Sequence, residues 1–215
     1  MTPPPQNPKI YHILNVDKLA SVIAAERLHC DSTIVTMNPV GTTIGMGTIK
    51  QRRFELPVKC YSNAAVADFV PFYFCPRSVM LYVIHCANSP ELEYKGGQGP
   101  IVHLEADLHK VIAWANSASQ SWAFSGSNAG AAYTSFWNDV NELHQLNWQN
   151  IAANQWSQAD VKEDKQAEFL MYKSFPWSLV DRIGTRSLDV LHAVHNAIAP
   201  AAHKPQVAMM PAWYY

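Results

Sequence analysis

A lone carboxylate inside an apolar run most constrains what this chain can fold into. The run covers residues 165–171 and contains Glu168, and an aromatic segment follows at 175–177. Side chains alternate along a β-strand, so Glu168 would share one face with Gln166 and Leu170, and residues 167, 169 and 171 would share the other. Such a strand would hold Glu168 rigidly, as catalysis requires of an acid. The ordinary alternative is a solvated glutamate on a half-exposed strand.

The composition is that of one globular domain. The chain has 215 residues, of which 48% are hydrophobic and 15% are charged. This length fits a single core. The formal net charge of −1 excludes a protein that binds nucleic acid through bulk charge, so a phosphate site must come from a local cluster. Seven Trp and nine Tyr favour a site for flat ligands or bases.

The cysteines and the N-terminal segment indicate whether a metal site, a membrane partner or an oxidising compartment is expected. The four cysteines form no CxxC pair, which predicts no metal site and reduced thiols in a cytoplasmic protein. Residues 1–8 are polar and proline-rich, which predicts a disordered lead before a single domain over 9–215. The sequence has no apolar run of 18 residues, so no membrane partner is expected. We expect a monomer.

The order of predicted elements favours a mixed α+β fold. Strands are predicted at 9–14, 69–75, 80–84, 101–104, around Glu168, and at 179–185 and 207–210. Helices are predicted after Asn15, after Asp107, and over 133–146 and 188–198. Residues 31–68 show no clean period and are predicted to form a long excursion. Strands and helices do not alternate regularly, which argues against a doubly wound sheet.

Four polar features stand in apolar or unusual settings. They are His12 in the first strand, the pair Arg52 and Arg53, Arg77 after an aromatic strand, and Glu168. Each alone has an ordinary reading as a core histidine, a solvated pair, a turn arginine or a surface glutamate. Together they would suit a pyrophosphate ligand with one acid, because arginine forks grip phosphate oxygens in pairs. Glu105 and Asp107 are weaker rivals for the carboxylate.

Several blocks of the sequence resemble the DarT family. The blocks are residues 11–13, 17–19, 70–78, 80–82, 96–98, 148, 156, 166–170 and 175–177. The resemblance extends from Tyr11 to Tyr215, and the blocks 70–78 and 166–170 are long and specific. DarT proteins are bacterial toxins that ADP-ribosylate bases of single-stranded DNA.

The resemblance implies an ADP-ribosyltransferase-like fold, with mixed central β-sheets, peripheral helices and NAD as co-substrate in a cleft. It implies that Glu168 is catalytic and that Arg53, or its neighbour Arg52, assists the chemistry. The residues expected at the NAD site are His12, Tyr11, Arg52, Arg77, Tyr73 and Met80. The chain departs from many relatives at Leu14 and Val79, and from some at Ser127-Asn128 in the substrate-recognition loop.

The expected DNA contacts combine aromatic platforms with basic side chains. The platforms are Trp122, Phe124 and Trp156, with Asn128 in the recognition loop. The phosphate partners are Lys162, Lys165, Lys173, Arg182 and Arg186. The ordinary alternatives are core aromatics and a solvated basic face.

The expected function is therefore a toxin that transfers ADP-ribose from NAD to a base of single-stranded DNA, releases nicotinamide and blocks replication. Thymine is the first choice and guanine the second. The resemblance also implies a macrodomain antitoxin, similar to DarG, that removes the adduct. Two alternatives are an enzyme acting on RNA or protein, and a non-catalytic single-strand-binding module.

Overall fold

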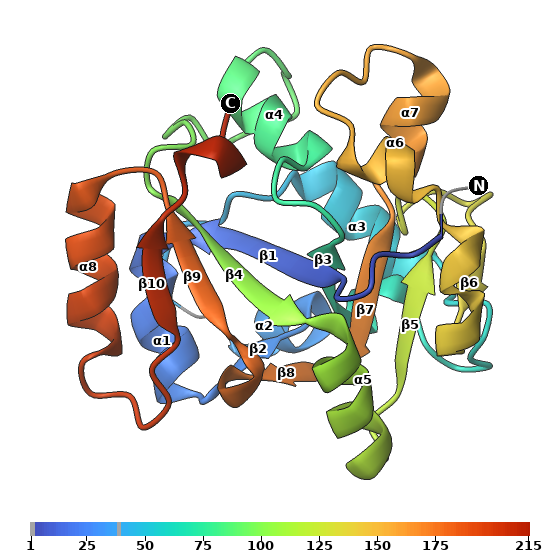
Figure 1. Cartoon of the computed structure of the whole chain (residues 1–215), viewed down its shortest axis with the longest axis horizontal. Coiled ribbons are helices and arrows are strands. Elements are labelled where there is room, and N and C mark those ends of the chain that lie inside the picture. The colour runs from blue at the N-terminus through green and yellow to red at the C-terminus, as the bar shows by residue number, and fades with distance from the viewer. Residues whose placement is uncertain (1–2, 38–39) are drawn as a thin grey trace.

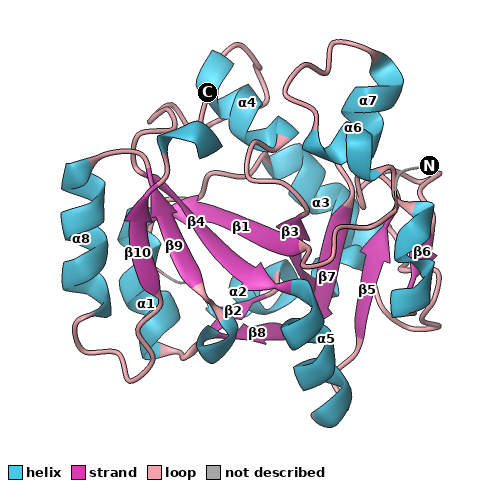
Figure 2. Ribbon diagram, in the orientation of Figure 1, coloured by secondary structure: helices cyan, strands magenta, loops and turns pink. Residues whose placement is uncertain are grey.

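An eight-stranded sheet forms the centre of the molecule. The computed structural model describes residues 3–37 and 40–215 (Figures 1 and 2). The strand order in the large sheet is β10-β9-β4-β1-β3-β7-β5-β6, and β2 and β8 form a small second sheet. The strands are β1 Lys9–Asn15, β2 Arg27–His29, β3 Phe69–Tyr73, β4 Ile101–Asp107, β5 Trp122–Ser125, β6 Phe136–Trp137, β7 Glu168–Tyr172, β8 Ser174–Pro176, β9 Arg182–Thr185 and β10 Gln206–Met209.

Helices surround this sheet (Figure 2). The α-helices are α1 Leu19–Ala24, α2 Asp31–Met37, α3 Gly47–Glu55, α4 Val79–Cys86, α5 Leu108–Ser117, α6 Trp148–Ala152, α7 Ala159–Asp164 and α8 Leu188–Ile198. Short 3₁₀ turns are η1 Val16–Lys18, η2 Val66–Asp68, η3 Val140–Gln145, η4 Trp177–Leu179 and η5 Pro211–Trp213. Side-chain caps explain several starts: Asn15, Ser78, Asp107 and Ser187 each accept a backbone N–H of the turn they precede.

The sheet comes apart between β1 and β3. Strand β1 pairs with β4 along its whole length, but its register with β3 is the single pair Tyr11 and Tyr73. On its other side β3 pairs with β7 over five residues, which places Tyr73 opposite Glu168. Glu168 therefore begins its strand beside the point where the sheet separates.

The alternation predicted around Glu168 is confirmed. Phe169 and Met171 belong to the main core cluster with Phe72 and Phe175, whereas Leu170 packs with Phe69 in a separate cluster. Side chains along a strand alternate between its two faces. Glu168, the first residue of β7, therefore lies on the same face as Leu170 and opposite to Phe169 and Met171.

The mixed fold and most predicted elements are confirmed. A large, mostly antiparallel sheet is combined with surrounding helices. Strands lie at the predicted positions 9–14, 69–75, 101–104, 179–185 and 207–210, with ends shifted by one to three residues. Helix α8 begins and ends as predicted, and Asp107 caps α5.

Three predicted segments are corrected. Residues 80–84 lie in helix α4, because Ser78 Oγ accepts the Leu81 N–H and begins a helix that a short apolar run does not distinguish from a strand. Residues 133–146 form β6 and η3, since Asp139 caps a new turn. The excursion over 31–68 contains α2 and α3, whose mostly polar sequences hide their periodicity.

Part of the lead predicted over residues 1–8 contacts the rest of the chain. Pro8 is buried and its carbonyl accepts the Leu108 N–H at 3.1 Å, while Pro5 and Asn7 line a cavity. Residues 1–2 of the lead and 38–39 of the excursion lie outside the described residues. Within the described part of the chain, no helix is long and apolar enough to cross a membrane.

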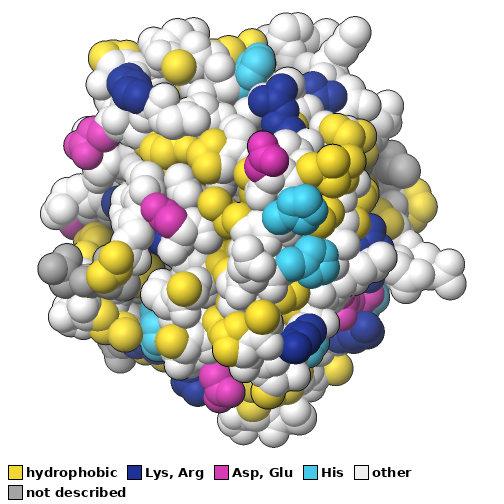
Figure 3. Space-filling model, turned by 90° about the vertical axis from the view of Figure 1, so that its left-hand side faces the viewer, with side chains coloured by type: hydrophobic (Ala, Val, Ile, Leu, Met, Phe, Trp, Pro, Cys, Tyr) yellow, Lys and Arg dark blue, Asp and Glu magenta, His cyan; other side chains and the backbone are white. Residues whose placement is uncertain are grey.

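Charges of both signs share the surface. The face turned to the viewer in Figure 3 carries basic, acidic and histidine side chains among apolar ones. This mixture agrees with the net charge of −1. This face therefore offers no continuous basic surface to a polyanion.

Candidate active site

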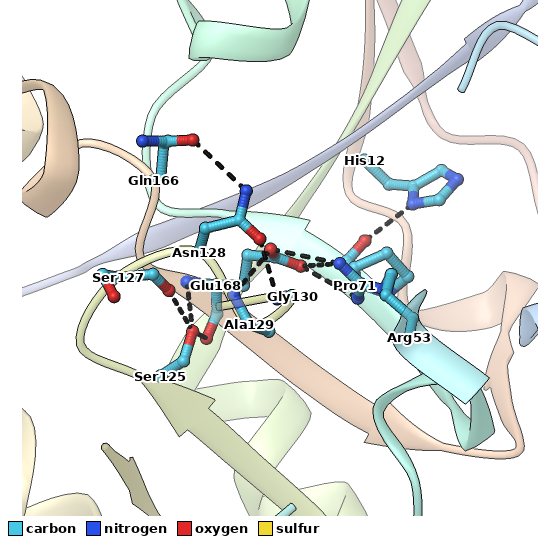
Figure 4. Close-up of polar contacts among 10 residues, drawn as sticks. All are labelled: His12, Arg53, Pro71, Ser125, Ser127, Asn128, Ala129, Gly130, Gln166 and Glu168. Carbon is cyan, nitrogen blue, oxygen red and sulfur yellow. Dashed lines mark hydrogen bonds and ion pairs between the residues drawn. The ribbon is translucent and has the colours of Figure 1, made fainter. Parts of the chain in front are cut away.

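Glu168 and Arg53 form a buried ion pair (Figure 4). Arg53 Nη1 lies 3.2 Å from Glu168 Oε1 and 3.0 Å from Oε2, and Nη2 lies 3.1 Å from Oε2. Glu168 is 2% exposed and Arg53 7%. Burial by itself would lower the pKa of Arg53, but the Glu168 carboxylate outweighs it and the pKa is raised. Arg53 therefore carries its positive charge against the Glu168 carboxylate.

Helix α3 positions Arg53. Arg53 is its buried residue, whereas Arg52 is exposed. From the sequence alone, the choice between Arg53 and its neighbour Arg52 was open. In the helix the two side chains point about 100° apart, so only Arg53 reaches Glu168.

The hairpin loop after β5 supplies the remaining contacts of Glu168. The Ala129 N–H donates to Oε1 at 3.2 Å. Asn128 Oδ1 accepts the Gly130 N–H at 2.7 Å, and its Nδ2 donates to Gln166 Oε1 at 3.2 Å. Ser125 Oγ accepts the Glu168 N–H at 3.1 Å. The loop thus aims one backbone donor at the carboxylate, and Asn128 uses its amide to shape the loop.

A cavity of about 260 Å³ opens beside this pair. Its lining includes His12, Tyr73 and Met80 from the predicted set. His12 Nδ1 lies 2.7 Å from the Pro71 carbonyl, so it donates and leaves Nε2 as an acceptor. Burial lowers the pKa of His12, which favours its neutral form.

The cavity also carries cations that the sequence analysis missed as site residues. Lys18, Arg27 and Lys50 line it, and Lys50 forms an ion pair with Asp31 at 2.9 Å. Lys50 and Arg53 lie three residues apart on α3 and therefore on one face, which connects the cavity to Glu168. A helical reading of the basic run 50–53 could have found this relation.

Three residues predicted for the NAD site lie elsewhere. Tyr11 and Arg77 line a second cavity, and Arg52 is on the outer face of α3. Tyr11 neighbours His12 on β1, so its side chain leaves the opposite face of the strand. The structure does not bring these three residues together at the first cavity, and contact with NAD stays a prediction for them.

Several residues predicted to contact DNA lie in the core or away from Glu168. Trp122 and Phe124 are core residues, stacked on Phe169 and Trp137 respectively. Lys173 binds Asp68 at 2.7 Å at the far end of β7. Arg182 on β9, and Arg186 just beyond it, are separated from β7 by β4, β1 and β3, a distance of roughly 19 Å across the sheet.

Four other residues predicted to contact DNA lie on the loop after β5, on α7 or beside it. Asn128 holds the loop, and Lys162 is exposed on α7. Trp156 packs edge-on against Tyr82, with ring centroids 4.8 Å apart. Lys165 is 2% exposed and lines the second cavity. Direct DNA contact by these residues stays a prediction.

The rival carboxylates have other partners. Glu105 lies 3.5 Å from Arg182 Nε, and Asp107 binds Lys9 at 2.7 Å. Among residues 3–37 and 40–215, no group of three or more His, Cys, Asp or Glu side chains could hold a metal ion. The site thus offers one aimed carboxylate, one arginine fork and a basic cavity, which suits stabilisation of a developing positive charge next to a phosphate-bearing ligand.

Comparisons with known proteins agree with this chemistry. The family model described as "ssDNA thymidine ADP-ribosyltransferase, DarT" matches residues 11–215. A DNA ADP-ribosyl transferase from Thermus sp. (strain 2.9) is 35% identical over 98% of both chains. One from Mycobacterium tuberculosis is 30% identical over 96% of this chain and 88% of its own length.

Solved structures give the same relationship. The structure of Thermus sp. 2.9 DarT in complex with ADP-ribosylated ssDNA aligns with a TM-score of 0.89 at 33% identity, over 98% of both chains. The same protein in complex with NAD+ aligns with a TM-score of 0.83 at 32% identity, over 98% of this chain and 99% of that one. The chain therefore belongs to the DarT family of single-stranded DNA ADP-ribosyltransferases.

Proposed function

We propose that this enzyme transfers ADP-ribose from NAD to a thymine base of single-stranded DNA, with Glu168 and Arg53 as the catalytic residues. The observation that carries these roles is the buried Arg53–Glu168 pair beside the cavity lined by His12, Tyr73 and Met80. NAD would occupy that cavity, with its pyrophosphate near Lys18, Arg27 and Lys50.

The carboxylate meets the main demand of the reaction. Breaking the bond to nicotinamide leaves positive charge on the ribose, as in glycoside hydrolysis. A fixed carboxylate next to that carbon stabilises the charge as it develops. Glu168 is fixed by Arg53, by Ala129 and by its own strand.

Contact with a ribose hydroxyl requires one existing bond of Glu168 to yield. A carboxylate has about four lone-pair sites, and here Arg53 and Ala129 fill them. Arg53 Nη1 is shared between both oxygens, so loss of its longer contact frees an acceptor while Arg53 stays bound. The acceptor base must also lose a proton, and Glu168 is placed to receive it.

The loop over 125–134 presents the acceptor base to this centre. Its Ala129 N–H donates to Glu168, its Asn128 side chain donates to Gln166, and Tyr133 on it is 72% exposed. Single-stranded substrate avoids the few kcal/mol needed to unstack a base. Thymine is preferred on the family's description, with guanine as the second candidate.

Mass spectrometry of a mixed-sequence oligonucleotide incubated with NAD tests this function. We expect one ADP-ribose on thymine, none on a duplex of the same sequence, and none with RNA or the protein itself. Modification of guanine would contradict the assignment of thymine as the acceptor base but not the transfer of ADP-ribose to DNA. Binding of the oligonucleotide without consumption of NAD would show a binding module rather than an enzyme.

The same chemistry makes the enzyme a toxin when its target is a replicating chromosome. ADP-ribose on the pairing edge of a template base stops a polymerase, so a cell that encodes the enzyme needs an antitoxin, which we take to be a DarG-like macrodomain hydrolase. A cytoplasmic monomer would suffice for this role. Induction in bacteria should stop growth, with rescue by a co-expressed macrodomain hydrolase. Equal toxicity of the wild type and an inactive Glu168 variant would contradict the toxin assignment.

A further inference from the structure

A second cavity, of about 370 Å³, lies past the end of β3. Residues 5 and 7–9, the segment 74–77 and helix α6 contribute to its lining, and none of its lining residues lines the first cavity. We propose that this cavity holds a nucleotide that neighbours the modified base in the DNA strand. This inference rests on the proposed function and adds a subsite to it.

Lys165 provides the strongest reason to expect an anion there. It is 2% exposed, and Nζ donates to the Ile151 carbonyl at 2.8 Å and to Cys75 Sγ at 3.4 Å. Burial raises the pKa of Cys75, so this partner is a neutral thiol. In the part of the chain that the structure describes, no carboxylate forms an ion pair with Lys165. Buried charges are normally paired, and a backbone phosphate would provide the missing charge.

Arg77 brings a second cation to the same cavity. Its guanidinium lies 4.3 Å above the centroid of Tyr215, and Nη1 reaches Asn154 Oδ1 at 3.5 Å. Its Nε is buried and has no hydrogen-bond partner among the described residues. Tyr215 Oη in turn donates to the Arg77 carbonyl at 2.9 Å. The fork is held in place on a ring while its donors stay available, as phosphate recognition requires.

Aromatic side chains complete the lining. Tyr11, Phe74 and Trp148 border the cavity, and the rings of Phe74 and Trp148 meet edge to face at 5.3 Å. Aromatic rings beside cations are the usual means of holding a base and its phosphate without reading a sequence. The volume lies within the range of small-molecule sites.

The cavity is also at the right distance from Glu168. Cys75 follows Tyr73 by two residues, and Tyr73 pairs with Glu168 across the sheet. Two residues of extended chain cover about 7 Å. One nucleotide of a stacked strand advances about 3.4 Å, so the cavity lies one or a few nucleotides from the acceptor.

Binding of a fluorescent single-stranded oligonucleotide without NAD tests the subsite. Arg77→Ala and, separately, Asn154→Asp, which adds a negative charge at an exposed lining position, should each weaken binding by about tenfold. The slope of log K against log salt should fall by about 0.7 for Arg77→Ala, the value for one lost phosphate contact on a single strand. Arg186→Ala, across the sheet, is the matched control and should bind as the wild type does. KM for NAD should not change.

Abasic scanning locates the nucleotide. In the wild type, removal of one particular base beside the acceptor should weaken oligonucleotide binding. In Asn154→Asp, removal of the same base should weaken binding less, because the variant and the missing base affect one contact. Unchanged DNA binding in both variants, or a raised KM for NAD with unchanged DNA binding, would overturn the subsite. Because binding is measured without NAD, absence of transfer by the wild type would contradict the enzyme and leave this test intact.

Discussion

The ion pair of Arg53 and Glu168 affects both stability and chemistry at the residue scale. Each side chain is almost fully buried, and each is the other's main partner. Removing one partner of such a pair leaves an uncompensated charge, which typically costs about 3–5 kcal/mol. A truncation at either position therefore changes the fold and the reaction together, and an isosteric change is the better probe.

Glu168→Gln should abolish transfer while the protein stays folded. The amide keeps the shape of the side chain but loses the charge that stabilises the ribose cation, so kcat should fall by at least ~10²-fold. Single-turnover transfer to a labelled oligonucleotide measures the loss, and circular dichroism checks the fold. Glu142→Gln, at a partly exposed position on η3, serves as control. Activity within about threefold of wild type would exclude Glu168 as the catalytic group.

Arg53→Ala and Arg52→Ala should behave very differently. Loss of Arg53 leaves Glu168 buried without a cation, so both transfer and the free energy of unfolding should drop, the latter by about 3–5 kcal/mol. The free energy of unfolding of Arg52→Ala should stay within about 0.5 kcal/mol of the wild-type value, and its transfer activity should be kept, because Arg52 is exposed. Urea titrations and transfer assays on both proteins measure this. Equal behaviour of the two variants would contradict the assignment to Arg53.

The recognition loop shows how one element sets up another. Ser127 N–H and Oγ both contact Thr134 Oγ1, at 3.2 and 2.9 Å, and Lys59 Nζ donates to the Thr134 carbonyl at 2.8 Å. These contacts close the loop across its base. Its tip is shaped by Asn128, whose turn aims the Ala129 N–H at Glu168.

Asn128→Ala should lower kcat more than it affects KM for NAD. The alanine cannot accept the Gly130 N–H, so Ala129 loses its fixed direction, and a loss of roughly 10-fold is expected for one misaligned donor. Asn128→Ser should recover part of the rate, because a serine hydroxyl forms the same turn more weakly. Steady-state kinetics with NAD varied distinguishes the two effects. An unchanged rate in Asn128→Ala would show that the turn is not needed to position Glu168.

At the scale of the whole molecule, the core contains histidines that resist protonation. His103 is fully buried, its Nε2 lies 2.9 Å from the Pro76 carbonyl, and burial lowers its pKa to about 4. His12 is shifted in the same direction by burial. Between pH 4 and 6.5 the unfolded chain binds more protons than the folded one, so stability falls as the pH falls through this window.

His103→Gln should flatten that dependence. With a pKa of about 4 in the folded protein, His103 alone should lower the free energy of unfolding of the wild type by about 2 kcal/mol when the pH falls from 7 to 5. Urea denaturation at both pH values measures this change. The loss of unfolding free energy between pH 7 and pH 5 should be smaller in His103→Gln than in the wild type by about 2 kcal/mol, whatever the absolute stability of the variant. Exposed His192→Gln is the control. The lowered pKa values of Asp68 and Asp107 act below pH 4 and do not interfere.

Local signals in the sequence determined much of this protein. Alternation around Glu168 placed it on a strand, and the caps at Asn15 and Asp107 marked where helical turns begin. These signals act between residues that are close in the chain, so a single sequence contains them. The specific blocks at 70–78 and 166–170 likewise indicated the family.

Only the tertiary structure decided which side chains form the site. Arg53 and Glu168 are 115 residues apart, and no local pattern states that α3 turns Arg53 inward and Arg52 outward. Trp122 and Phe124 are residue types that can stack on bases, but their strand β5 lies inside the sheet and their side chains are buried in the core. Burial and the meeting of distant groups arise from packing between elements, and for this reason Lys165 looked like a surface lysine until the structure placed it in a cavity wall.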